Sequence, residues 1–219
     1  MSVLEVLIEY RQAYLSGIWV TLQLCAVAWC GGLIAGGVLA LLCDRWPVAL
    51  GLPLRGISRT VEAIPILVLL FWAHYPLQSA LGIVIPPFVT MATLLTGINL
   101  LTVYGIIWQG IRAVPREYIE AATVCGVPKT RIYWRIKIPL ALRNALGALT
   151  SSQILVLHLS IFGSLISVQE IFRVSQQINA VTYRPTEVYS GLAVFFLCIC
   201  LPLNLLAAHL HKKYSSERA

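Results

Sequence analysis

The chain alternates between long apolar runs and short polar stretches. Apolar runs of about 20 residues are long enough to cross a bilayer as helices, and four segments reach that length. A fifth segment is almost purely apolar in its centre but less regular, and its interruptions are Glu62, Pro65, His74 and Pro76. The pattern therefore predicts five membrane-spanning helices, over residues 17–42, 60–81, 88–111, 145–166 and 188–210.

The composition supports a membrane protein. Hydrophobic residues make up 58% of the 219 residues and charged residues only 11%, and the mean hydropathy is +0.82. These values lie far from those of soluble globular domains. At this length we expect one domain, so residues 1–219 are predicted to form a single all-α transmembrane domain.

The basic residues are unevenly distributed between the predicted loops. Thirteen of the sixteen Lys and Arg fall in segments 43–59, 112–143 and 211–219, which alternate with the loops that hold the other three. Basic loops are typical of the cytoplasmic side of a membrane. We therefore expect an external N-terminus and a cytoplasmic C-terminus. The net charge of +7 then follows from membrane topology and requires no nucleic-acid partner.

A polar segment, 112–140, interrupts the apolar pattern. Pro115 suits a first helical position, and Gly126 suits the left-handed residue that ends a helix. Pro128 is expected to start a second short helix and Pro139 to stop it. Such an island cannot lie in lipid, so it faces water, either as the docking surface for another protein or as a solvated hairpin without a partner.

The spacing within this segment resembles a family signature. Glu120-Ala121-Ala122 is followed after three residues by Gly126, and Ile136-Lys-Ile-Pro139 comes nine residues later. The family pattern ends Ile-x-Leu-Pro, so Ile138 is a conservative departure. The arrangement resembles the permease subunits of bacterial ABC importers with the type I permease fold, and the resemblance implies that these residues form coupling helices on a cytoplasmic ATPase subunit. The implied coupling residues are Glu120, Ala121, Ala122, Gly126, Ile136 and Pro139.

Further segments narrow the resemblance and extend it over nearly the whole chain. Gly17-Ile-Trp-Val-Thr-Leu-Gln-Leu24, Ala63-Ile-Pro-Ile-Leu-Val-Leu-Leu-Phe71 and Thr182-Tyr-Arg-Pro-Thr-Glu-Val-Tyr189 look like segments of polar amino acid permeases. The resemblance implies an importer of a polar amino acid, with opines and other small zwitterions left open. It also implies a bacterial inner-membrane location, a second permease chain (the same or homologous), two ATP-binding cassette subunits and an extracytoplasmic solute-binding protein.

The chain lacks the Gly-x-x-x-x-Gly-Lys-(Ser/Thr) sequence that holds nucleotide phosphates. We therefore expect ATP and Mg to bind the ATPase subunits and no cofactor to bind this chain. The six cysteines have no metal-ligand spacing, and no nucleophile–base pair marks an enzyme. A self-sufficient secondary transporter or channel is the alternative, but it would leave the coupling signature unexplained.

Several positions depart from the charges common in polar amino acid permeases. Glu62 stands where the family usually has Arg, Gly105 and Trp108 stand where it often has Glu and Arg, and His158 stands where it has Lys. These departures put in doubt whether this chain grips a charged substrate as its relatives would.

Polar residues inside predicted spans are costly and usually face a cavity or another helix. The candidate pathway residues are Glu62, Asn99, Gln153, His158 and Ser160. Each has a structural alternative: Glu62 could be solvated or paired with Arg59, His158 could be a neutral hydrogen-bonding residue, and the other three could join helices through hydrogen bonds.

Overall fold

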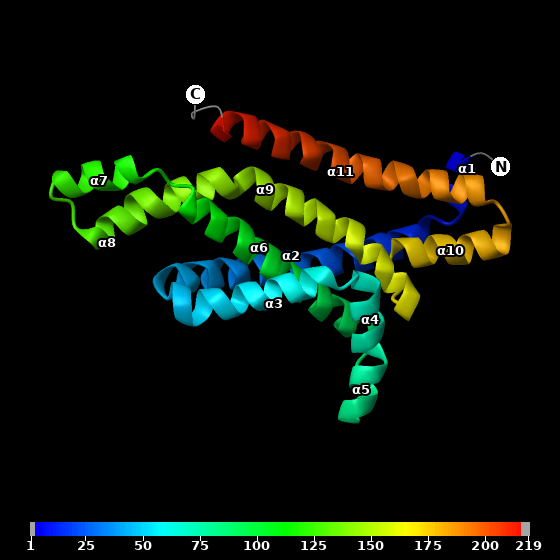
Figure 1. Ribbon diagram of the computed structural model, residues 1–219. Helices are drawn as coiled ribbons and strands as arrows, with labels where there is room; N and C mark the ends of the chain where they lie inside the picture. The colour runs from blue at the N-terminus through cyan, green and yellow to red at the C-terminus, as the bar shows by residue number, and fades with distance from the viewer. Residues whose placement is uncertain (1–2, 216–219) are drawn as a thin grey trace.

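The computed structural model describes residues 3–215, and every regular element within them is helical (Figure 1). Residues 1–2 and 216–219 lie outside this range. The predicted positions of the two chain ends relative to the membrane therefore fall partly on residues that the structure does not describe. The elements in chain order are α1 (Val3–Glu9), α2 (Arg11–Arg45), the π-helical turn η1 (Pro47–Gly51), α3 (Leu52–Ala63), α4 (Ile66–His74), α5 (Pro76–Leu81), α6 (Pro87–Arg112), α7 (Arg116–Val124), α8 (Lys129–Ile132), the π-helical turn η2 (Tyr133–Lys137), α9 (Ile138–Leu159), the 3-10 helix η3 (Ser160–Ile166), α10 (Ile171–Thr182) and α11 (Pro185–Ser215).

Four described helices are long and apolar enough to cross a membrane: Arg11–Arg45, Pro87–Arg112, Lys129–Ile166 and Pro185–Leu210. The fifth predicted span corresponds to a bent pair, Pro47–Ala63 and Ile66–Leu81, whose two parts meet at 97°. The all-helical prediction is confirmed. The span that was least regular in sequence is the one that the structure breaks.

Close packing of α2 against α6 forms the centre of the molecule. Gly36 of α2 approaches α6 so closely that a Cβ there would lie 2.6 Å from the carbonyl oxygen of Leu100, and a Cβ at Gly32 would overlap the side chain of Asn99. Small residues allow helix backbones to approach in this way. Buried side chains of α2, α6 and α9 complete the core beside this contact.

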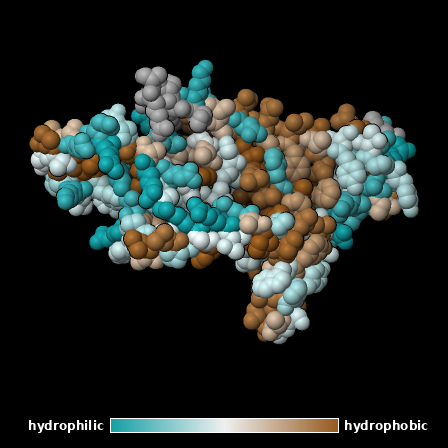
Figure 2. Space-filling view, in the orientation of Figure 1, coloured by the Kyte–Doolittle hydropathy of each residue, from teal (hydrophilic) through white to brown (hydrophobic). Residues whose placement is uncertain are grey.

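The two ends of the bundle differ. Figure 1 places α1 and α10 at one end, whereas α7, α8 and the C-terminal end of α11 lie toward the other. Figure 2 shows hydrophobic residues gathered over the middle of the visible face and hydrophilic residues toward the α7–α8 end. An apolar middle between polar ends is the pattern expected of a membrane-embedded bundle.

The prediction that Pro139 stops a helix was wrong. The helix that begins at Lys129 continues to Ile166, and Pro139 lies in the first turn of α9, directly after η2. In this π-helical turn the N–H of Ile138 donates to the carbonyl of Tyr133, five residues back. The wider turn accommodates the proline ring that would clash in a regular α-helix. Pro115 and Pro128 also lie one position earlier than predicted, at the N-caps of α7 and α8.

Candidate functional site

The polar segment forms a helical hairpin whose turn is built on Gly126. Gly126 has φ +73°, as the sequence predicted. The N–H of Val127 donates to the carbonyl of Ala122 at 3.1 Å, and the N–H of Cys125 donates to that of Ala121 at 3.1 Å. These bonds satisfy carbonyls at the end of α7, and a left-handed residue at this position makes the first of them possible. Gly126 therefore sets the angle at which α8 leaves α7.

Helix α7 projects from the bundle and buries none of its residues (Figure 1). Val124 is 88% exposed and Tyr118 is 56% exposed, and Glu120 and Ala121 also face away from the body. Apolar side chains on a projecting, otherwise polar helix are typical of a protein interface. The hairpin offers such a surface at its outer end.

The inner end of the hairpin is attached firmly to the bundle. Ile132 and Ile138 are buried, and Ile136 is partly buried between them. Lys137 pairs with Asp44 at the end of α2 at 2.8 Å. The base of the hairpin is therefore held to α2 by an ion pair and is continuous with α9.

The second feature is the break between α3 and α4. Ile64 and Pro65 have extended backbone angles, with ψ of 125° and 135°, and α4 and α5 project away from the bundle (Figure 1). A residue that precedes proline disfavours the α conformation, which accounts for the break at this place. Glu62 lies in the last turn before it, and Ser58 donates a hydrogen bond to its carboxylate at 2.9 Å.

Glu62 lines a pocket of about 240 Å³ at this break. The rest of the wall is mostly apolar and comes from α3, α4 and α6 together with Leu159. Thr102 is the other polar side chain there, but its hydroxyl donates to the carbonyl of Ile98 on its own helix. Glu62 is therefore the one ionisable group lining this pocket.

The other candidate pathway residues do not all come together. Asn99 is 1% exposed and exchanges hydrogen bonds with Gln153, at 3.0 and 3.3 Å between amide atoms, while also donating to the carbonyl of Ala28. This pair joins α2, α6 and α9. Ser160 is fully buried and donates to the carbonyl of Leu157 at 2.8 Å. Asn99 is not among the residues that line the pocket of Glu62.

His158 lies on a side of α9 that faces α11. Its Nε2 lies 3.3 Å from the Sγ of Cys200, and its ring centroid lies 6.2 Å from that of Phe196. The side chain is exposed in the described chain. The position that carries Lys in the resembled family thus holds a polar group at the edge between two spans.

Trp108, which stands at a family Arg position, is enclosed by cations. The guanidinium of Arg55 lies 3.6 Å from its ring centroid and that of Arg112 lies 4.0 Å from it. Stacking of guanidinium groups on an indole is favourable. The tryptophan therefore links α3 to α6 close to the start of the hairpin.

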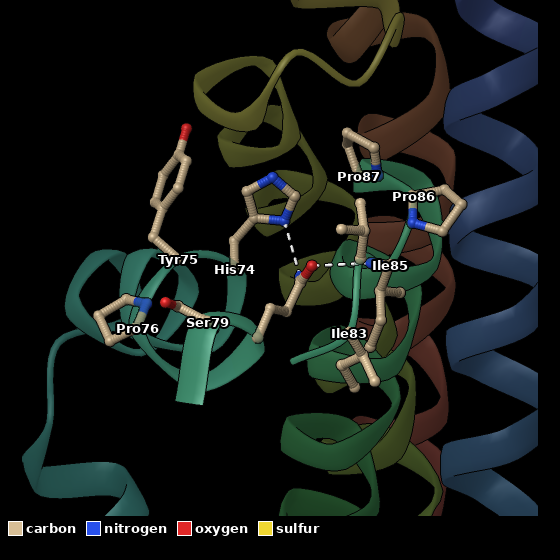
Figure 3. Close-up of a pocket in the computed structure, with 10 residues that line it drawn as sticks. His74, Tyr75, Pro76, Ser79, Ile83, Ile85, Pro86 and Pro87 are labelled. Atoms are coloured by element: carbon tan, nitrogen blue, oxygen red, sulfur yellow. Dashed lines mark hydrogen bonds between the residues drawn. The ribbon is translucent and has the colours of Figure 1, made fainter. Parts of the chain in front are cut away.

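Two polar groups were not predicted from the sequence, and the first is a network around Gln78 beside a pocket of about 730 Å³ at α5 (Figure 3). The side chain of Gln78 accepts the N–H of Ile85 at 2.8 Å and donates to the hydroxyl of Thr90 at 3.0 Å. The Nδ1 of His74 lies 3.2 Å from the Nε2 of Gln78. The polar residues that interrupt the fifth apolar segment were the only available signal. This network fixes α5 to the start of α6.

The second unpredicted group is Glu170, which is fully buried at the N-cap of α10. Its carboxylate accepts the N–H groups of Phe172 at 2.8 Å and Arg173 at 2.7 Å. Burial raises the pKa of Glu170 to about 7, although these two hydrogen bonds act in the opposite direction.

No group of His, Cys, Asp and Glu among the described residues could hold a metal ion.

Comparison with solved structures gives the same architecture. A chain of an amino acid ABC transporter crystallised with histidines superposes with a TM-score of 0.86 at 26% identity, covering 97% of this chain and 99% of that one. A chain of the methionine ABC transporter MetNI has a TM-score of 0.76 at 18% identity, covering 94% of this chain and 98% of that one, which shows a common fold.

Sequence relatives and a family match agree with the fold. The octopine transport system permease protein OccM of Rhizobium radiobacter is 30% identical over 207 residues, which cover 90% of this chain and 82% of OccM. The histidine/lysine/arginine/ornithine permease protein HisM of Escherichia coli K12 is 35% identical over 104 residues, covering 48% of this chain and 44% of HisM. The family of binding-protein-dependent transport system inner membrane components matches residues 32–216. The chain therefore belongs to this family, as a permease component of an ABC importer and not as its ATPase.

Proposed function

We propose that the chain forms, with a second permease chain of the same or a homologous kind, the pathway for a polar amino acid or a related small zwitterion such as an opine. An extracytoplasmic solute-binding protein would deliver the substrate, and two ATP-binding cassette subunits that hold ATP and Mg would drive its transport. The similarity to OccM and HisM supports this substrate class.

The observation that carries the proposal is the projecting hairpin with its anchored base. Its outer helix, α7, leaves every side chain at least partly exposed, whereas Ile132 and Ile138 fix its inner end in the core. A rigid lever of this kind can pass movement of a docked ATPase subunit into the spans. We assign Glu120, Ala121, Ala122, Gly126, Ile136 and Pro139 to the coupling segment, with the first four on or beside the docking helix.

The proposed orientation has the hairpin and the C-terminus in the cytoplasm and the N-terminus outside. The basic residues support it, since seven of the sixteen Lys and Arg lie in 112–143. The end of the bundle that carries α1 and α10 would then face the solute-binding protein.

We propose that Glu62 provides the charged wall of the pathway. Glu62 faces the pocket at the helix break and is exposed in the described chain. A carboxylate attracts the ammonium group of an amino acid most strongly where water is partly excluded, which here requires a covering surface from the second permease chain. The proposed pathway also includes Asn99, Gln153, His158 and Ser160. Of these, His158 is exposed, whereas the side-chain amides of Asn99 and Gln153 form hydrogen bonds with each other within this chain. The second permease chain would complete the pocket.

The test is uptake by the intact complex in sealed vesicles, with labelled histidine and octopine and with unlabelled amino acids as competitors. Uptake should require ATP and the solute-binding protein. Glu62→Gln should lower uptake about tenfold, because the substitution removes one charge–charge attraction of moderate strength, and about 1.4 kcal/mol corresponds to a factor of ten. Glu187→Gln is the matched control, because Glu187 lies in the first turn of α11, does not line the pocket of Glu62, and pairs with Arg184 at the long distance of 3.8 Å.

Uptake without ATP would instead support the secondary transporter or channel. Normal uptake by Glu62→Gln would remove Glu62 from the pathway without affecting the assignment of the coupling segment.

A further inference from the structure

A cavity of about 600 Å³ lies between the end of α2 and the base of the hairpin. Neither energy coupling nor the substrate pathway accounts for it. We propose that this cavity binds an anionic phospholipid, with the phosphate on its basic wall and the start of an acyl chain on its apolar wall.

The apolar wall comes from the last turns of α2. Val38, Leu41 and Leu42 line the cavity there, and Val38 is 51% exposed. These residues belong to the membrane-length helix that ends at Arg45. This side of the cavity therefore lies at the level where lipid chains begin.

The basic wall comes from both sides of the cavity. Arg45 contributes from α2, and Lys129 and Lys137 contribute from α8 and η2. Asp44 neutralises Lys137 at 2.8 Å. Among residues 3–215, no carboxylate lies within ion-pair distance of Arg45 or Lys129. Two positive charges are therefore left at the cavity.

An aromatic side chain marks the boundary between the two walls. Trp134 lines the cavity and is 56% exposed, and Trp46, which follows α2, is 49% exposed beside the guanidinium of Arg45, 5.6 Å from its ring centroid. Tryptophan is enriched at the level of lipid headgroups. The cavity thus combines an acyl-chain surface, headgroup-level aromatics and uncompensated cations.

This combination selects the ligand class. Basic pockets between membrane helices recognise anionic headgroups. A free phosphate or nucleotide would leave the wall formed by Val38, Leu41 and Leu42 uncovered, and a zwitterionic lipid would bring no net charge to Arg45 and Lys129. An anionic phospholipid satisfies both walls. Binding of such a lipid does not depend on which solute is transported.

The experiment uses the full chain, extracted with the subunits that accompany it and stripped of lipid. Native mass spectrometry would count bound phosphatidylglycerol against phosphatidylcholine of the same chain length, with inorganic phosphate as a third probe. We expect retention of phosphatidylglycerol and not of the other two. Replacing Arg45 and Lys129 together by Gln should weaken the binding of phosphatidylglycerol roughly 30-fold. Each basic residue near an anionic lipid surface typically contributes about a factor of five to binding, and two residues are removed.

Two further variants make the result specific. Arg131→Gln is the matched control, because Arg131 lies on the same short helix as Lys129 but does not line the cavity. Val38→Trp should reduce phosphatidylglycerol binding without changing charge, by filling the apolar wall. Equal binding of both lipids, binding of phosphate as tightly as of phosphatidylglycerol, or equal losses in Arg131→Gln and the double variant would overturn the proposal.

Discussion

Lys137 joins the base of the hairpin to the first long helix by placing its Nζ 3.0 Å from Oδ1 and 2.8 Å from Oδ2 of Asp44. The two side chains are only 23% and 15% exposed, and they are 93 residues apart in the sequence. A bidentate, half-buried pair at this place resists movement of the hairpin relative to α2.

Removing one partner of this pair should destabilise the protein. Lys137→Met leaves the Asp44 carboxylate, which is 15% exposed, without the Lys137 ammonium that pairs with it, and we expect a loss of about 2 kcal/mol of unfolding free energy. Thermal unfolding of Lys137→Met, Asp44→Asn and the double variant measures the coupling between the two residues. Additive effects would show that the pair contributes nothing of its own. Glu187 provides the control: its pair with Arg184 is longer, at 3.8 Å, and more exposed, so Glu187→Gln should change stability less.

Gly126→Val should uncouple ATP hydrolysis from transport. A Cβ at Gly126 would meet no atom within 4 Å, so the effect arises from backbone strain at φ +73° and not from a clash. We expect substrate-stimulated ATPase activity to fall about tenfold or more while membrane insertion persists.

Gly82 offers a matched control for this variant, since it has φ +65° and an equally open surrounding at the end of α5. Gly82→Val imposes similar strain away from the hairpin and should keep the stimulation. Gly126→Asn should also keep most of it, because Asn tolerates the left-handed conformation. Normal stimulation in a correctly inserted Gly126→Val complex would contradict the assigned role of the turn.

The hairpin turn could be predicted from the sequence because its cause is local. Glycine at a helix end between two proline-led segments has few conformational alternatives, and the structure confirms the left-handed Gly126. The break near Pro65 was not predicted, because residues 60–81 were predicted as a single span. The polar and proline interruptions of that segment are its local signal. The coupling role of the hairpin came from the family resemblance and stays a prediction.

The remaining features depend on contacts distant in sequence. Nothing local to Asn99 indicates that its amide meets Gln153 on another helix. The continuation of the helix through Pro139 depends on the π-helical turn before it, and proline alone argues for a stop. Burial of Glu170 follows from packing of α10 against α2, where the N–H of Ile171 donates to Thr21 at 3.1 Å.

The topology can be tested by labelling one of the chain's own cysteines, Cys125, which is exposed in the hairpin turn. Val181 is 72% exposed near the end of α10, so Val181→Cys places a second labelling site at the opposite end of the bundle. A membrane-impermeant maleimide should label Val181→Cys in intact cells and Cys125 only after permeabilisation. Cys125→Ser gives the background. Reporters after Ser2 and Arg218 test the same orientation, and labelling of both sites in intact cells would reject it.

Glu170 should make stability depend on pH. Burial raises its pKa to about 7 in the folded protein from an ordinary value of about 4.5, so the folded state binds the proton more tightly. The contribution to stability is fully present below about pH 4.5 and is lost as the pH rises to about 7, on the order of 3 kcal/mol over this window. Glu170→Gln should flatten the dependence of the unfolding temperature on pH there. Glu187→Gln serves as the control, and an unchanged slope in Glu170→Gln would refute the assignment.

His158→Leu tests whether the polar group on α9, in the third of the four long helices, belongs to the pathway. A neutral imidazole can accept from or donate to a zwitterion without the desolvation cost of a buried cation, so its loss should lower uptake per assembled complex several-fold while assembly persists. The contact between His158 and Cys200 at 3.3 Å supports a different role, in which the imidazole only holds α9 against α11. Cys200→Ala separates the two roles, because it removes the contact and keeps the imidazole. If His158 belongs to the pathway, Cys200→Ala transports normally per complex. If instead both variants lower the yield of complex and leave uptake per complex unchanged, His158 is a packing residue and leaves the pathway set.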